Sequence, residues 1–287
     1  MHHNRFDYLP LSRRPVLKLP NNARLAVWII LNIEYHEFDG PGVGISPPVV
    51  LPDVLNFGWR DYGIRTGIWR MMELLDKYEL RGTIALNAKI CEFHPEIIEE
   101  ARKRNWAFMG HGVTNSQSLA GLSEEAERGL IATTLETIKR SVGSVPRGWL
   151  GPGLAETVHT PDLLAEAGVS YLCDWCNDDQ PYPMRVKRGR LISIPYSVEI
   201  NDIPFFVGKG STPDQFRQAI QDQFEVLYEE GKNSAKVMAI ALHPFLVSVP
   251  YRHKYFAQAL DYLTRHRDVW FTTGDEIATW YYDNYYK

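Results

Sequence analysis

Residues 27–37 read VWIILNIEYHE, and this stretch decides the fold of the chain. Its first half is an apolar run with β-branched residues, which is typical of a strand covered on both faces in a parallel sheet. The run ends in Glu34, His36 and Glu37. A β/α barrel builds its active site from such side chains at the C-terminal ends of buried strands. The alternative interpretation of this stretch alone is a strand that runs into a loop with a solvated acid.

Four further apolar segments end in the same way. They are residues 83–86, 106–109, 170–173 and 237–242, and the polar residues that follow them are Asn87, His111, Asp174 and His243. Since the C-terminal ends of parallel strands meet at one edge of the sheet, five such endings predict a shared rim that carries titratable side chains.

Composition limits the class of protein. The 287 residues are 45% hydrophobic, which is enough for one large α/β barrel domain or two small domains. The net charge is -4, and no basic patch indicates a nucleic-acid partner. The N-terminus shows no secretory signal, and no apolar run approaches the ~20 residues of a membrane span. We therefore expect a cytoplasmic protein with a small-molecule substrate and no nucleic-acid or membrane partner.

The three cysteines, Cys91, Cys173 and Cys176, do not indicate a disulfide framework, because their number is odd and no signal peptide precedes them. The last two form a C-x-x-C pair. A zinc knuckle would need a second ligand pair at a suitable spacing, and a redox pair would stand at a helix N-terminus rather than after a strand. We expect neither function here.

Seven or eight strands alternate with helices, a pattern that predicts a β/α barrel. Residues 1–24 are expected to form an extended arm, and residues 25–287 a single barrel domain. Residues 38–63 are rich in proline and glycine and are expected to form a functional loop over the rim. Capping boxes at Thr212 and Thr273 predict two helix starts.

The order of the strand-end motifs resembles the polysaccharide deacetylase (NodB-homology) superfamily, and within it the allantoinase and cyclic-imide hydrolase branch. The motifs are an acid after the first strand, GHG at 110–112, RGWLGPG at 147–153, NDDQPY at 177–182, IPY at 194–196 and LHP at 242–244. The resemblance extends over roughly residues 25 to 280. It implies an α/β fold of the distorted (β/α)7 barrel type and a hydrolase that acts on carbon–nitrogen bonds other than peptide bonds.

The resemblance also bears on metal binding. The family holds its metal with the second Asp of a Thr-Phe-Asp-Asp motif and with both histidines of a His-x-x-x-His motif. These three positions are Tyr35, His111 and Asn115 in this sequence, while Glu34 takes the position of the base. A phenol and an amide are weak zinc ligands. We therefore expect no metal and no other cofactor; the alternative is zinc bound by His111 with His36 and Glu37.

The predicted reaction is the ring opening of a cyclic imide or ureide. Glu34 would be the general base, with its pKa raised by a partly apolar site, and His243 the general acid. Arg147 would orient the acid or hold a substrate carbonyl, and His111 would stabilise the oxyanion. The candidate substrate-binding residues are Asn115, Trp149, Trp175, Asp174 and Asp178.

Structural roles compete with each of these assignments. His111 would then satisfy backbone groups, His243 would be a turn residue, Arg147 would pair with Asp174 or Asp178, and the tryptophans would belong to the core.

Two other functions remain open at this point. One is a metal-dependent deacetylase of N-acetylated sugars, and the other is a non-catalytic barrel that binds a ureide or a sugar. The aromatic residues 280–286 and the long loop favour a homo-oligomer, either a dimer or a tetramer.

Overall fold

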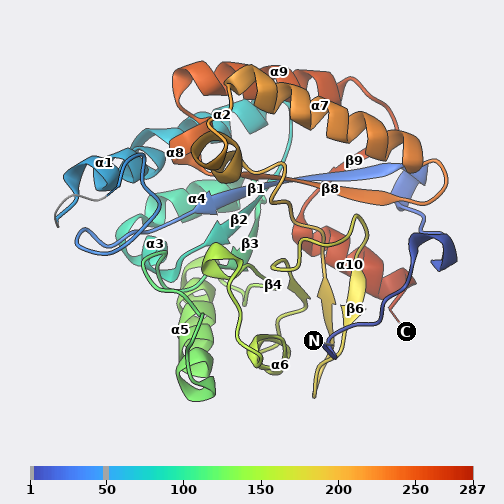
Figure 1. Ribbon diagram of the computed structural model, residues 1–287, viewed down its shortest axis with the longest axis horizontal. Coiled ribbons are helices and arrows are strands. Elements are labelled where there is room, and N and C mark those ends of the chain that lie inside the picture. Colours follow the sequence, from blue (N-terminus) through green and yellow to red (C-terminus); the bar gives the residue numbers. More distant parts are fainter. Residues whose placement is uncertain (1–2, 48–51, 287) are drawn as a thin grey trace.

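The computed structural model describes residues 3–47 and 52–286 (Figure 1). Strand β1, Leu25–Ile33, pairs with three other strands and is buried along its whole length. Its alternate side chains enter two different cores, with Leu31 and Ile33 on one face and Trp28 and Ile30 on the other. The prediction of a strand covered on both faces is confirmed, and this is why its sequence is a continuous apolar run.

The strands form one curled sheet in the order β6-β7-β5-β4-β3-β2-β1-β8, and β9 also pairs with β1. All neighbours are parallel except β6 and β7. Beyond β7, Asn201 forms a bridge with Ala241 of β8, so the two ends of the sheet approach each other. The other strands are β2 Gly82–Leu86, β3 Ala107–Gly110, β4 Gly148–Trp149, β5 Tyr171–Leu172, β6 Tyr182–Met184, β7 Leu191–Ser193, β8 Lys236–Leu242 and β9 Val269–Thr272.

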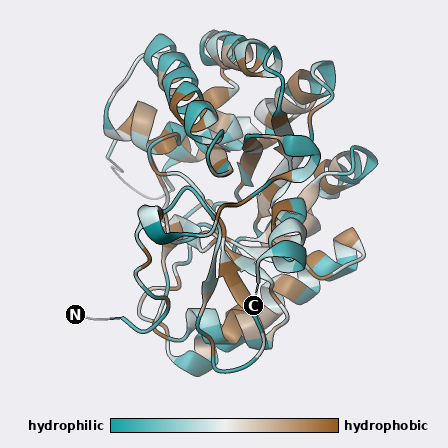
Figure 2. Cartoon of the chain, turned by 90° about the vertical axis from the view of Figure 1, so that its right-hand side faces the viewer, coloured by the Kyte–Doolittle hydropathy of each residue, from teal (hydrophilic) through white to brown (hydrophobic). Residues whose placement is uncertain are grey.

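Helices connect and cover these strands, so the predicted α/β fold, a distorted β/α barrel in one domain, is confirmed. Figure 1 shows α7 and α9 side by side over the region of β1 and β8, and Figure 2 shows polar residues on the outer helices around more apolar strands. The helices are α1 Val54–Tyr62, α2 Ile68–Lys77, α3 Ala88–Phe93, α4 Pro95–Lys103, α5 Glu124–Val142, α6 Thr160–Glu166, α7 Pro213–Glu230, α8 Pro244–Val247, α9 Pro250–Thr264 and α10 Gly274–Asn284.

Local sequence signals explain several boundaries. Both predicted capping boxes are present, at Thr212 before α7 and at Thr273 before α10. The loop predicted over residues 38–63 is shorter than expected, because Asp53 caps α1 and the chain is helical from there on. Residues 48–51 of that prediction lie outside the described residues. Strands β4 and β6 were not predicted, since two or three residues are too few to show a periodic pattern.

The N-terminal residues pack on the barrel. Leu17 and Leu19 are buried in the same core cluster as Trp280 of α10. Arg14 forms an ion pair of 2.5 Å with Asp178. No helix within residues 3–47 and 52–286 is long and apolar enough to cross a lipid bilayer.

Candidate active site

The strand register brings three of the predicted side chains to one rim. Leu31 of β1 is the partner of Leu242 in β8, and Ile33 is the partner of Leu86 in β2. The residues that follow these strands therefore emerge at the same level. Glu34 follows β1 directly, His111 follows β3, in which Gly110 is the partner of Leu86, and His243 follows β8.

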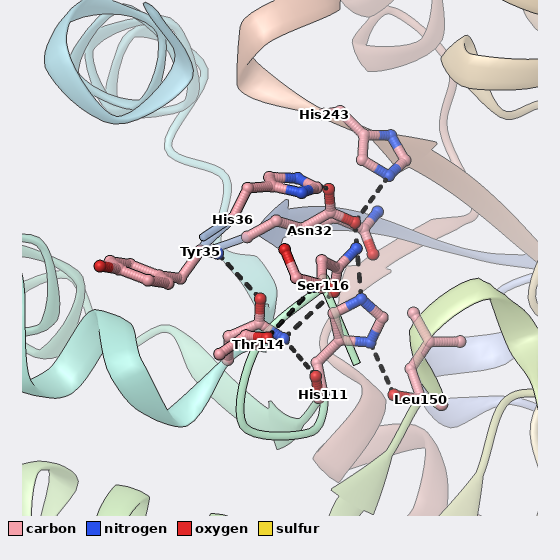
Figure 3. Close-up of polar contacts among 12 residues, drawn as sticks. Asn32, Tyr35, His36, His111, Thr114, Ser116, Leu150 and His243 are labelled. Atoms are coloured by element: carbon pink, nitrogen blue, oxygen red, sulfur yellow. Dashed lines mark hydrogen bonds and ion pairs between the residues drawn. The ribbon is translucent and has the colours of Figure 1, made fainter. Parts of the chain in front are cut away.

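Glu34 lies at the centre of three imidazoles. Its Oε1 is 3.5 Å from His111 Nε2 and 3.4 Å from His243 Nε2, and its Oε2 is 3.2 Å from His36 Nε2. The four side chains are at most 5% exposed. Figure 3 shows the three histidines approaching the same region from different elements. The site therefore consists of one buried carboxylate surrounded by groups that can carry positive charge.

This environment sets the protonation states of Glu34 and His243. Burial by itself would raise the pKa of Glu34, but the charge of His243 and the polar contacts with the three imidazoles hold this pKa well below its usual range. Burial opposes the charge of His243, yet Glu34 and Asp202 raise the pKa of His243 to about 10. The prediction that the pKa of Glu34 would be raised is wrong. At neutral pH the pair is a carboxylate and an imidazolium.

Asp202 holds His243 in place. Its Oδ1 lies 2.7 Å from His243 Nδ1, and its Oδ2 accepts the backbone N–H of His243 at 2.8 Å. Asp202 is fully buried and lies next to Asn201, which is bridged to β8. Because Nδ1 is engaged by this carboxylate, His243 presents its Nε2 to Glu34.

His111 is fixed by the chain that follows β4. Its Nδ1 lies 2.6 Å from the carbonyl oxygen of Leu150, so the Nδ1–H donates to that carbonyl. Its Nε2 is buried and has no hydrogen-bond partner among the described residues. In the neutral ring this Nε2 carries a lone pair, and it becomes a donor only when the ring is doubly protonated. The predicted oxyanion role therefore requires cationic His111.

A cavity of about 600 Å³ opens above this group. Its wall includes Asn115 and the 41–43 segment of the long loop. No lysine or arginine among the described residues lines it. The remaining lining residues are Asn32, Glu34, His36, His111, Ser116, Gln117, Ser118, Leu150, Gly151, Pro152, Gly153, Leu154, Ala155, Tyr196, Val198, Asn201, Ile203, Pro204 and His243. The size is that of a small-molecule site.

Arg147 does not reach the cavity. Its Nη1 donates to Thr279 Oγ1 at 2.7 Å and to the carbonyl oxygen of Asp275 at 3.3 Å, both in α10. Arg147 precedes β4 and therefore lies at the N-terminal end of that strand, opposite the rim. The prediction that it orients the acid or the substrate is wrong, and so is the alternative of an ion pair with Asp174 or Asp178.

The prediction that Trp149 and Trp175 bind the substrate is also wrong. Trp149 is fully buried in the core cluster beneath α5 and α6. Trp175 donates its Nε1–H to Glu156 at 3.0 Å and packs edge-on against Phe6. Neither tryptophan lines the cavity.

The two aspartates predicted to bind the substrate, Asp174 and Asp178, do not line the cavity either. Asp174 accepts the backbone N–H of Gly151 at 2.7 Å and so holds a segment of the cavity wall from behind. Asp178 pairs with Arg14 on the N-terminal segment. Of the five predicted substrate-binding residues, Asn115 is the one that lines the cavity.

Comparisons with known proteins show which family this sequence and this structure resemble. Residues 57–172 match the sequence model of the polysaccharide deacetylase family. The structure of PuuE allantoinase superimposes with a TM-score of 0.85 at 25% identity, over 98% of this chain and all of that one. The chain therefore resembles the polysaccharide deacetylase superfamily in sequence over residues 57–172 and in fold over nearly its whole length. It is accordingly a hydrolase of carbon–nitrogen bonds other than peptide bonds.

Two further relatives agree with this placement. A Pseudomonas aeruginosa protein whose structure is named as a polysaccharide deacetylase superimposes with a TM-score of 0.86 at 25% identity, over 96% of both chains. A Schizosaccharomyces pombe protein with the same family name is 27% identical over an alignment of 293 positions that covers 90% of each chain.

The metal site of the superfamily does not fit the residues of this chain. The ring of Tyr35 stacks on Phe93 at 5.2 Å and points away from the histidines (Figure 3). Asn115 Oδ1 accepts from Asn87 at 3.2 Å. Within the described residues, no three His, Cys, Asp or Glu side chains are arranged to hold a metal ion. The alternative zinc ligands, His111 with His36 and Glu37, are not brought together either, because the carboxylate of Glu37 pairs with Lys89 at 2.5 Å.

Four residues of the site were missed as substrate or catalytic candidates: His36, Asp202, Asn32 and Tyr196. His36 and Asn32 lie inside the stretch that decided the fold, so their position at a strand end was the available signal. Asp202 stands at the start of a short π-helical turn, Ile203–Gly208, and its proximity to His243 depends on the closure of the barrel.

Proposed function

We propose that the chain opens the ring of a neutral cyclic imide or ureide by hydrolysis, without a metal ion. The observation that supports this most directly is the buried ion pair of Glu34 and His243, 3.4 Å apart at the wall of the cavity. One member is ready to accept a proton and the other to donate one, which is the requirement for acid–base hydrolysis of a carbon–nitrogen bond.

The reaction proceeds in two proton transfers. Glu34 takes a proton from water as the water oxygen attacks the ring carbonyl carbon. The C–N bond then breaks, and His243 gives its Nε2 proton to the departing nitrogen. The products are a carboxylic acid and an amide or urea nitrogen within one opened chain, so water is consumed and no other reactant is needed.

Glu34 and His243 return to their starting protonation states after the ring has opened. After the ring opens, Glu34 carries a proton and His243 is neutral. Because Glu34 has a lowered pKa and His243 a raised one, the transfer of this proton across the 3.4 Å gap is downhill. The low pKa makes Glu34 a weaker base than the sequence predicted, and the imidazolium compensates by protonating the leaving nitrogen.

The cavity fits a small neutral substrate. A volume of about 600 Å³ accommodates a five- or six-membered ring with substituents. Its described lining holds no lysine or arginine, and the imidazolium of His243 is already paired with Glu34, so a neutral substrate fits this lining better than an anionic one. The likeness to PuuE allantoinase supports a ureide or imide ring.

Metal-dependent removal of an acetyl group from an N-acetylated sugar is the second candidate. The family match and the name of the fission-yeast relative favour it. Two of the family's ligand positions count against it, because Tyr35 is a phenol stacked on Phe93 and Asn115 is an amide whose Oδ1 accepts from Asn87.

The test is hydrolysis by protein that has been stripped with a chelator and analysed for metal. The substrates are succinimide, hydantoin, allantoin and an N-acetylglucosamine oligomer, and Glu34→Gln is the control. Ring opening that persists without metal and is lost in the variant supports the proposal. Activity that appears only with zinc, and only on the acetylated sugar, would refute it.

A further inference from the structure

Three asparagine side chains line the cavity, and each has its amide orientation fixed by the protein itself. We propose that Asn115, Asn32 and Asn201 bind an unsubstituted O=C–N(H)–C=O edge of the substrate. Asn115 and Asn201 donate to its two carbonyl oxygens, and Asn32 accepts its N–H. This inference rests on the proposed function and narrows its substrate class to rings with a free imide-type N–H between two carbonyls.

Asn115 presents its NH2 group. Its Oδ1 accepts from Asn87 Nδ2 at 3.2 Å. The orientation of Asn87 is fixed in turn, because its Oδ1 accepts the backbone N–H of Tyr35 at 2.8 Å and its Nδ2 donates to the carbonyl oxygen of His111. Within the described chain no group accepts from the Asn115 NH2, so this donor is available to a ligand in the cavity.

Asn201 also presents its NH2 group. Its Oδ1 accepts the backbone N–H of Ile203 at 3.0 Å, and a backbone N–H can only donate. The residue is 7% exposed and lines the cavity. None of the described residues accepts from its Nδ2.

Asn32 has the opposite orientation. Its Nδ2 donates to the carbonyl oxygen of Leu242 at 3.1 Å and to the Tyr196 hydroxyl at 3.2 Å. Its Oδ1 lies 3.5 Å from the same hydroxyl, which is longer than an ordinary O–H···O bond. The side chain is 2% exposed, and among the described residues its Oδ1 has only this long contact from the Tyr196 hydroxyl, so it can accept a further hydrogen bond. Figure 3 shows Asn32 between the labelled histidines.

The order of the sheet puts Asn32 on a strand that lies between the two strands beside which Asn115 and Asn201 are positioned. Asn115 follows β3, Asn32 belongs to β1, and Asn201 is bridged to β8, while the strands run β3-β2-β1-β8 around the barrel. An imide edge has two carbonyl acceptors on either side of one N–H donor, so the two patterns are complementary. A lactam or an N-acetyl group has one carbonyl, and an N-methyl imide has no N–H.

A buried acceptor that loses its donor costs binding energy, so the site should reject rings without the N–H. The experiment compares succinimide with N-methylsuccinimide. We expect wild-type kcat/KM to be at least roughly tenfold higher for succinimide. Asn32→Leu, which removes the acceptor and offers an apolar contact to the methyl group, should lower kcat/KM for succinimide and bring the ratio to one or below. Asn177→Leu makes the same change at an exposed site outside the cavity and should leave the ratio unchanged.

Binding to Glu34→Gln protein, measured by calorimetry, separates recognition from turnover. Tighter binding of succinimide than of its N-methyl form supports the inference even if no ring is opened, an outcome in which the proposed function alone has failed. Equal turnover of both rings by wild type, or an unchanged ratio in folded Asn32→Leu, overturns the inference and leaves the proposed function standing. Circular dichroism establishes that each variant is folded.

Discussion

Asp202 holds His243 with both of its carboxylate oxygens, one 2.7 Å from Nδ1 and the other 2.8 Å from the backbone nitrogen. A single fully buried acid therefore fixes the ring orientation of the proposed general acid and stabilises its charge. The two residues come from different segments, and the bridge between Asn201 and Ala241 brings these segments together.

Asp202→Asn should lower kcat by roughly 10²- to 10⁴-fold, because general acid catalysis contributes on that scale. The amide keeps the shape but removes the charge that raises the pKa of His243. The alkaline limb of the pH–rate profile should therefore move below its wild-type position. A lower kcat with an unmoved alkaline limb would mean that Asp202 acts only on the fold.

The wild-type pH–rate profile is the second prediction. Activity requires ionised Glu34, which is lost only as pH falls through its lowered pKa, and protonated His243, which is lost as pH rises through about 10. We expect kcat/KM to be nearly constant from about pH 5 to about pH 9 and to fall outside that range. The check is a profile in overlapping buffers with stability measured at each end. A narrow maximum near pH 6.5 would contradict the protonation states assigned here.

Much of the fold and part of this site could be predicted from the sequence. Glu34, His111 and His243 follow apolar runs directly, so the strand pattern itself indicates where they emerge. Asp202 could not be found in this way, because its contact with His243 depends on how the barrel closes. The prediction for the pKa of Glu34 was wrong for a related reason, since the charge of His243 comes from the end of β8, a neighbouring strand that is far away in the sequence.

The predicted role of Arg147 was wrong for a different reason. This residue stands before its short strand rather than after it, and the two residues of β4 gave no pattern from which to tell the two ends apart. Trp149 lies within the same strand, where a side chain faces a core instead of the rim.

Arg147→Ala tests this correction. The variant should keep kcat and KM close to the wild-type values, because the guanidinium contacts only α10 among the groups to which it donates. Its loss of two hydrogen bonds should lower the free energy of unfolding by about 1–2 kcal/mol. Urea unfolding and steady-state kinetics on the same preparation provide the measurement. A large fall in kcat at unchanged stability would return Arg147 to the catalytic residues.

The stability of Glu34→Gln as a function of pH tests the ion pair without any substrate. Glu34 has a lowered pKa in the folded state, so its stabilisation is present above its unfolded pKa near 4.5 and is lost as pH falls through the folded value. His243 has a raised pKa, so its contribution is complete below its unfolded value near 6.5 and is lost as pH rises through about 10. The advantage of wild type over Glu34→Gln should therefore be largest between about pH 4.5 and 6.5 and decline on both sides. Denaturant unfolding at a series of pH values measures this difference directly. A difference that is independent of pH would show that Glu34 and His243 are not paired as charges, and it would remove the basis for the downhill proton transfer that resets the proposed reaction.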